Sequence, residues 1–195
     1  MKRRGRVIVF GCSTGGVRAM QTAFGLLPVD YPWPIVGVCH LHAQGRWLMP
    51  EVLARGCQLK VQGAVEKERL QGGHLYLAPP GYHLLLERDR SCSLTVDEKV
   101  NGSRPAIDPL FESAADSLGD QSIAVILSGA NRDGAEGAYR IAAQGGLCVI
   151  QDPNTAEAEE MPRAALAVVP AAQRVVVRLE EIGPFLQTMG VVTNG

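Results

Sequence analysis

Ser13, His40 and Asp133 each closely follow a short apolar run of the sequence. Hydrolysis through a covalent intermediate needs these three residue types: a nucleophile, a base that takes its proton, and a carboxylate that orients the imidazole. In an open α/β sheet, binding sites form beyond the carboxyl ends of the strands. If the apolar runs are strands of one sheet, the three side chains lie at one edge of it, where acyl-transfer chemistry is expected.

The segment around Ser13 reads Gly11-Cys12-Ser13-Thr14-Gly15-Gly16 and contains a nominal G-x-S-x-G. Between a strand and a helix, this pattern is typical of a turn that presents a nucleophilic serine. Backbone N–H groups at the start of the helix then stabilise an oxyanion. The same glycine-rich turn equally suits a phosphate. It is neither a full G-x-G-x-x-G nor a P-loop with its lysine, which weakens specific nucleotide binding.

The second candidate feature is the pair His40 and His42, which on an extended chain point to the same side. With Cys39 next to them, a metal site is an alternative. Metal-dependent barrel hydrolases use such a pair, but 195 residues barely reach the lower limit for that barrel. Position alone does not choose between His40 and His42 as the base.

Asp108 and Asp152 are rivals to Asp133 as the orienting carboxylate, and all three also have structural interpretations. Asp133 suits the N-cap of the helix that follows it, and Asp108 suits the N-cap of another helix. Asp152 with Pro153 is typical of a turn that ends a strand. His74 and His83 are expected in structural or rim positions, and the remaining cysteines as small buried hydrophobes.

Four apolar runs are typical of strands buried on both faces of a parallel sheet; they cover residues 7–10, 35–39, 123–127 and 147–151. Apolar residues recur at helical spacing in three segments, two of them between these runs and one near the end of the chain. They are Val17, Met20, Phe24 and Leu27; Ala135, Ala138, Ile141 and Ala142; and Ile182, Phe185, Leu186 and Met189. Strand–helix–strand units of this length are typical of βαβ motifs. A further helix is predicted over 107–118, with Asp108-Pro109 at its start and Gly119 at its end.

The middle of the chain has a different pattern. Residues 74–78 and 83–87 flank Pro79-Pro80-Gly81, and 93–97 follow after a polar turn. This pattern predicts a hairpin or meander of antiparallel strands at one edge. The predicted fold class is therefore α/β, a doubly wound, mostly parallel sheet with an antiparallel hairpin insertion.

Composition narrows the class of protein. With 195 residues, 46 % of them hydrophobic, residues 1–195 are expected to form a single domain. The 19 basic and 20 acidic residues lack the charge footprint of a nucleic-acid binder. Five cysteines without a C-x-x-C pair argue against a disulfide framework or a zinc ribbon. No run is long enough for a secretory signal or a membrane helix, so a cytoplasmic protein without membrane insertion is expected.

Taken together, the motifs are those of a known family. The chain resembles the catalytic domain of the chemotaxis-receptor protein-glutamate methylesterases, the CheB-type enzymes. The matching segments occur in the family's order: 11–16, His40, 75–79 with His83, 104–111, 126–137, Gln151-Asp152 and 161–164. They extend over most of the chain, and their order makes the resemblance specific.

The resemblance implies a Ser–His–Asp triad, with Ser13 as nucleophile, His40 rather than His42 as base, and Asp133 as the orienting carboxylate. It implies an oxyanion and substrate neighbourhood at Thr14, Gly129, Ala130 and Asn131. The implied reaction is hydrolysis of glutamate γ-methyl esters on the cytoplasmic helices of chemoreceptors, with deamidation of particular glutamines as a second activity. No metal or other cofactor is required.

The chain departs from the family pattern in three places. It has His40-Leu41-His42 for His-Met-Pro, and Ser128-Gly129-Ala130-Asn131 for Thr-Gly-Met-Gly. Glu159-Glu160 stand where the family has Phe-Gly, which adds charge near the expected rim of the site. An asparagine in place of glycine at position 131 is expected to narrow the allowed backbone geometry.

The family usually carries a receiver domain before the catalytic domain, whereas here the first predicted strand begins near Arg6. A free-standing catalytic domain or a fragment is therefore expected, and a free-standing form would take its regulation from a protein in trans. Two other functions remain open: a docking module of the same fold that binds receptors without turnover, and a phosphate- or nucleotide-binding domain using residues 11–16. Both predict that Ser13→Ala has little effect.

Overall fold

A computed structural model describes residues 5–40 and 47–190. In these ranges a seven-stranded sheet has the order β3-β4-β2-β1-β7-β8-β9, and every neighbouring pair is parallel. Its strands are β1 (Val7–Cys12), β2 (Ile35–Cys39), β3 (Lys60–Gly63), β4 (His74–Leu77), β7 (Ser122–Ile126), β8 (Leu147–Gln151) and β9 (Arg174–Val177). The four apolar runs are thus strands of one parallel sheet, as the sequence predicts.

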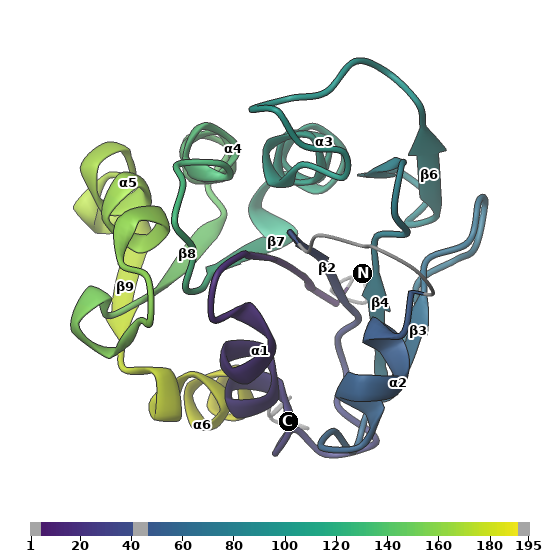
Figure 1. Ribbon diagram of the computed structural model, residues 1–195, viewed down its shortest axis with the longest axis horizontal. Coiled ribbons are helices and arrows are strands. Elements are labelled where there is room, and N and C mark those ends of the chain that lie inside the picture. Colours follow the sequence, from purple (N-terminus) through teal and green to yellow (C-terminus); the bar gives the residue numbers. More distant parts are fainter. Residues whose placement is uncertain (1–4, 41–46, 191–195) are drawn as a thin grey trace.

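Helices cover both faces of the sheet, with α1, α2 and α6 on one side and α3, α4 and α5 on the other (Figure 1). The α-helices are α1 (Gly16–Phe24), α2 (Met49–Ala54), α3 (Ile107–Leu118), α4 (Ala135–Ala143), α5 (Glu160–Val168) and α6 (Leu179–Gly190). Short 3-10 turns occupy Gly119–Gln121, Pro153–Thr155 and Ala171–Gln173. The doubly wound α/β fold expected from the sequence is confirmed.

The apolar strands serve two cores because successive side chains point to opposite faces. In β1, Val7 and Val9 pack in the core beneath α3, whereas Ile8 and Phe10 pack in the core beneath α1 and α6. All four side chains are fully buried. This two-sided burial explains why β1 is a continuous apolar run with no polar alternation.

The hairpin prediction was partly wrong. Residues 74–78 do include a strand, β4, but it pairs in parallel with β2 and β3 inside the main sheet. The antiparallel insertion consists of β5 (His83–Leu86) and β6 (Cys92–Thr95), which form a separate two-stranded sheet. Leu75 and Leu77 are buried in one core and Tyr76 in the other, which is the burial of an internal parallel strand.

The strand order places a switch point at the centre of the sheet. From β1 the chain proceeds to β2, then to the edge strand β3, and comes back to β4 between them; it later crosses to β7 on the other side of β1. The carboxyl ends of β1, β2 and β7 therefore lie next to one another (Figure 1). This is the place where α/β sheets of this type form their binding sites.

None of the helices within residues 5–40 and 47–190 has the length and apolarity that crossing a membrane requires.

Candidate active site

Ser13, His40 and the loop after β7 meet at the carboxyl edge of the sheet. Beyond the ends of the strands, the Ser13 N–H donates to the Ser128 carbonyl over 2.9 Å. The His40 N–H donates to the Cys12 carbonyl, also over 2.9 Å. These backbone bonds continue the ladders of β1 with β7 and with β2, so rigid strands position both residues.

The turn after β1 requires glycine at position 15. Gly15 has a φ of 74°, and a Cβ there would lie 2.7 Å from the Glu157 Cβ. The Gly16 N–H donates to the Ser13 carbonyl over 2.8 Å, which closes the turn just as α1 begins. Ser13 is half-buried and lines the pocket described below.

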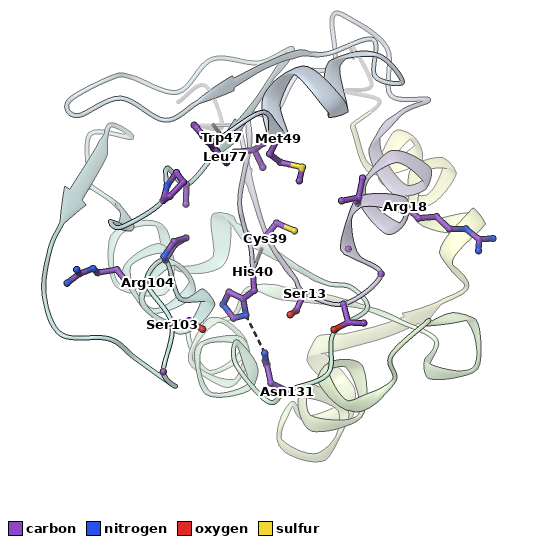
Figure 2. A pocket seen from close by; sticks show the side chains of 18 of the residues that line it. Ser13, Arg18, Cys39, His40, Trp47, Met49, Leu77, Ser103, Arg104 and Asn131 are labelled. Carbon is purple, nitrogen blue, oxygen red and sulfur yellow. Dashed lines mark hydrogen bonds between the residues drawn. The ribbon is translucent and has the colours of Figure 1, made fainter. Parts of the chain in front are cut away.

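His40 lies between a carboxylate and an amide. Its Nε2 is 3.0 Å from Asp133 Oδ2, although the ring N–H is not aligned with that oxygen as in an ideal hydrogen bond. On the other side of the ring, Nδ1 is 3.3 Å from Asn131 Nδ2. Figure 2 shows this contact with Ser13 nearby at the same end of the pocket. Nε2 therefore faces the buried Asp133, and Nδ1 is the ring nitrogen on the opposite side.

The Asp133 carboxylate accepts hydrogen bonds from two backbone N–H groups and one side-chain amide. Its Oδ2 accepts from the Ile107 N–H over 2.7 Å, and its Oδ1 accepts from the Asp108 N–H and from Asn101 Nδ2 over 3.2 and 2.8 Å. Burial by itself would raise the pKa of Asp133, but the hydrogen bonds from His40, Ile107 and Asn101 outweigh it and lower the pKa. Asp133 is thus held ionised at the N-terminus of α3, where the helix dipole favours negative charge.

Neither carboxylate caps a helix in the predicted way. The residue at the N-cap of α4 is Gly134, and Ala106 precedes the first residue of α3, so Asp108 lies within the first turn. The Asp108 carboxylate instead accepts from the Gly137 N–H over 2.8 Å and from Asn101 Nδ2 over 2.9 Å. Each aspartate therefore satisfies backbone donors of a helix that is distant in sequence, a pairing that capping patterns do not reveal.

Asn101 bridges the two carboxylates, since its amide nitrogen donates to both Asp108 and Asp133. It has a positive φ of 50°, a conformation that asparagine tolerates better than most residues. Burial raises the pKa of Asp108 to about 6, and the neighbouring charge of Asp133 adds to that effect. Sequence patterns did not single out Asn101, because its role depends on side-chain contacts across three segments.

The raised pKa predicts a pH-dependent stability difference between the wild type and Asp108→Asn. Asp108 binds its proton more tightly in the folded state than at its ordinary pKa of 3.8. Ionisation of Asp108 therefore destabilises the wild type as pH rises through about 6, and this cost disappears as pH falls toward 4. The unfolding free energy of the wild type minus that of the variant should rise by up to about 3 kcal/mol from pH 7 to pH 4.

Urea denaturation of both proteins at several pH values measures this difference. Groups that do not interact with Asp108 cancel in this difference, and the pKa of Asp133 is lowered from its ordinary value of 3.8 and so lies below the window. A difference that stays constant between pH 7 and pH 4 would contradict the raised pKa of Asp108.

Two further histidines, His74 and His83, lie within the described residues. His83 is buried, with Nδ1 accepting from the Ala106 N–H and Nε2 in contact with the Glu98 carbonyl, so it is structural as expected. His74, the first residue of β4, has its Nδ1 2.9 Å from the Gly72 carbonyl. His42 and Leu41 lie outside the described residues, as does Arg46. Within the described ranges, no three His, Cys, Asp or Glu side chains are grouped as a metal site would need.

The cysteines match the expectation of small side chains in or near the core. All five are free, with Cys12, Cys92 and Cys148 buried and Cys39 and Cys57 half-buried.

A pocket of about 1030 Å³ opens over Ser13 and His40. One wall is apolar and includes Trp47, Met49 and Leu77, which lie across the pocket from Ser13 in Figure 2. Charged residues also line the pocket: Arg18, Lys99, Arg104 and Glu157. Arg104 holds the loop that carries Lys99, since its guanidinium donates to the Val96 and Asp97 carbonyls over 2.7 and 2.9 Å.

Two departures from the family pattern can be located in the structure. Glu159 and Glu160 do not line the pocket; the Glu159 carboxylate accepts from Arg163 over 2.9 Å, and Glu157 is the acidic residue in the pocket wall. Asn131 is not strained, because Lys67, Arg90 and Asn101 are the non-glycine residues with positive φ in the described ranges.

The residues expected to stabilise an oxyanion differ in whether their backbone N–H groups already donate a hydrogen bond. The Gly129 N–H already donates to the Ala158 carbonyl over 3.0 Å. The N–H groups of Thr14 and Ala130 have no hydrogen-bond partner among the described residues. Thr14 and Asn131 both line the pocket beside Ser13.

Comparison with known proteins gives a consistent result. Residues 8–186 match the family described as CheB methylesterase. A protein of Leptospira interrogans is 48 % identical over 161 residues, which is 82 % of each chain, and its name provisionally assigns it protein-glutamate methylesterase and protein-glutamine glutaminase activities.

A protein-glutamate methylesterase/protein-glutamine glutaminase of Maricaulis maris is 32 % identical over 184 residues, which are 93 % of this chain but 45 % of the longer relative. The crystal structure of the Thermotoga maritima CheB methylesterase catalytic domain superposes with a TM-score of 0.88 at 29 % identity. The match covers 95 % of this chain and 99 % of that one.

Proposed function

The chain belongs to the CheB methylesterase family, and we propose that it hydrolyses glutamate γ-methyl esters with Ser13 as nucleophile, His40 as base and Asp133 as orienting carboxylate. The observation that carries the assignment is the position of His40. Its Nε2 lies 3.0 Å from a fully buried carboxylate, and its Nδ1 lies on the opposite side of the ring, at the pocket edge that also carries Ser13.

In the first half-reaction, Ser13 Oγ attacks the ester carbonyl and its proton passes to His40 Nδ1. The resulting imidazolium is stabilised by Asp133, whose lowered pKa keeps it ionised. Collapse of the tetrahedral intermediate breaks the bond to the methoxy group, which takes the proton from His40 and leaves as methanol. The product of this step is an ester between Ser13 and the glutamyl side chain.

In the second half-reaction, water attacks the glutamyl ester while His40 takes its proton. Ser13 regains that proton through His40, and the product acid releases its remaining proton to solvent and leaves as a carboxylate. One water is consumed in this second step, and neither step needs a metal or another cofactor. We propose that the N–H groups of Thr14 and Ala130 stabilise the negative oxygen, because no other described residue accepts from them.

The substrate we propose is a side chain on the cytoplasmic helices of methyl-accepting chemoreceptors, which places the reaction in the cytoplasm. A wide pocket with an apolar wall at Trp47 and Met49 suits a helix surface better than a small metabolite. The same steps with ammonia as leaving group would deamidate a glutamine. We further propose that the sheet and its helices form one catalytic domain, open to regulation by a protein in trans.

Methylated chemoreceptors incubated with the wild-type protein test this proposal. Methanol release is expected together with a loss of about 14 Da per hydrolysed ester on receptor peptides. Receptors that carry glutamine at the same positions should gain about 1 Da. Receptor binding without methanol release would instead support a docking module, and stabilisation by phosphate ligands alone would support a phosphate site.

A further inference from the structure

Asn131 makes two hydrogen bonds that join the ring of His40 to the backbone of Asp133. Its Oδ1 accepts from the Asp133 N–H over 3.0 Å, and its Nδ2 is 3.3 Å from His40 Nδ1. The side chain is half-buried and lines the pocket. The contact with His40 is drawn in Figure 2.

The first bond fixes which way the amide of Asn131 points. A backbone N–H only donates, so the atom that faces Asp133 N must be the amide oxygen. The NH2 group is thereby directed at His40 Nδ1. Because an NH2 group also only donates, Nδ1 must offer a lone pair, and the proton of the neutral ring sits on Nε2 toward Asp133.

We propose that Asn131 is a positioning residue that selects the Nε2–H form of His40 and opposes a second proton on Nδ1. This inference rests on the proposed function, because that form is the one able to accept the proton of Ser13. The contact of 3.3 Å is longer than a typical N–H···N bond, so the Ser13 hydroxyl can replace it during the reaction at small cost.

The groups around the His40 ring have opposite effects on its protonation. Asp133, 3.0 Å from Nε2, favours the doubly protonated imidazolium, and Asp108 lies behind it across Asn101. Asn131 presents the positive end of its amide dipole to Nδ1 and counteracts this in the resting protein. The charged residues Lys99, Arg104 and Glu157 line the same pocket, but none of them forms a hydrogen bond or ion pair with the His40 ring.

The variant Asn131→Asp changes the shape of the side chain little, but it replaces the hydrogen-bond donor that faces His40 Nδ1 by an acceptor. One carboxylate oxygen still accepts from the Asp133 N–H, but the other now faces Nδ1 and accepts instead of donating. His40 is then held as imidazolium or with its proton on Nδ1, and neither form accepts from Ser13. Asn131→Ala removes the contact without inverting it, so its effect should have the same sign and be smaller.

Nitrogen-15 NMR of the histidine rings gives a readout that needs no substrate, with the His40 signals assigned by comparison with His40→Gln. The wild type near pH 7 should show a protonated Nε2 and an unprotonated Nδ1. Asn131→Asp should show a protonated Nδ1 at the same pH. Arg132→Ala, which alters the exposed neighbour of Asn131, should give the wild-type spectrum.

Reaction of Ser13 with a fluorophosphonate reagent, measured against pH, gives the functional readout. Asn131→Asp should lower the rate about tenfold or more near pH 7 and move the low-pH limb up by about one unit, a shift equal to about 1.4 kcal/mol. Asn131→Ala should shift the low-pH limb by less, and Arg132→Ala should leave it unchanged.

Two results would overturn the inference: a wild-type ring with its proton on Nδ1, or an Asn131→Asp profile that is only scaled down at every pH. Either result leaves methanol release by the wild type unaffected, so it is distinct from failure of the proposed function. A wild type that neither releases methanol nor reacts at Ser13 would refute the proposed function, and the role of Asn131 with it.

Discussion

Ser13→Ala should release methanol from methylated chemoreceptors about 10⁶-fold more slowly than the wild type, the loss found when the nucleophile of a serine hydrolase is removed. The variant lacks the atom that forms the covalent intermediate, and none of the other groups in the site replaces it. The proposed oxyanion donors at Thr14 and Ala130 remain, so a small rate above that of water is expected.

The fold should tolerate this change. The Ser13 backbone bonds to Ser128 and Gly16 do not involve the hydroxyl, which has no hydrogen-bond partner among the described residues. The melting temperature should therefore stay within a few degrees of the wild type. Ser93→Ala on β6 is the matched control and should retain full activity. Equal release by Ser13→Ala and wild type would exclude the covalent mechanism and reopen a metal site at His40 and His42.

Asp133→Asn should lower kcat about 10⁴-fold, because an amide at this position sets the wrong ring form of His40. With its NH2 group directed at Nε2, the asparagine forces the ring proton onto Nδ1, where Ser13 needs a lone pair. Methanol release under substrate saturation measures kcat, and KM should change much less. The low-pH limb should be altered too, since Asp133 no longer stabilises the imidazolium.

This variant also carries a folding cost that the geometry explains. All four partners of the Asp133 carboxylate are donors, so the amide nitrogen faces a donor in either orientation. An unsatisfied buried donor costs about 1–3 kcal/mol, which urea denaturation will detect. Asp116→Asn on the exposed face of α3 is the control and should change both activity and stability little. Activity of Asp133→Asn within tenfold of wild type, in folded protein, would argue against the assigned role.

The elements that carry the site were predictable because their patterns are local. A strand buried on both faces is a continuous apolar run, which identified β1, β2, β7 and β8. The rule that sites form beyond strand ends then brought Ser13, the pair His40 and His42, and Asp133 together, and the family resemblance favoured His40. The edge strands β3 and β9 escaped notice because each has only four residues, most of them half-buried or exposed.

The predicted antiparallel pairing of β4 was wrong as well. Pro79-Pro80-Gly81 signals a turn, but a turn does not say whether the next strand returns to the same sheet. Here it leads away from the parallel sheet to the separate pair of β5 and β6.

The supporting contacts of the site were the least predictable part. Asp108 and Asp133 each accept from helices far away in the chain, and Asn101, which lies 32 positions before Asp133, joins the two carboxylates. Such contacts arise from tertiary packing, to which periodicity and capping patterns are blind. Asn131 was noted as a departure from the family pattern for its backbone, whereas its consequence lies in its side chain.

The most direct test of the central claim is to titrate activity with a fluorophosphonate while mapping the modified residue by mass spectrometry. Ser13 should be the modified residue, and methanol release should fall in proportion and reach zero at one adduct per chain. Ser13→Ala should take up no reagent under the same conditions. Methanol release that continues at the full rate after Ser13 is completely modified would contradict the role of Ser13 as nucleophile.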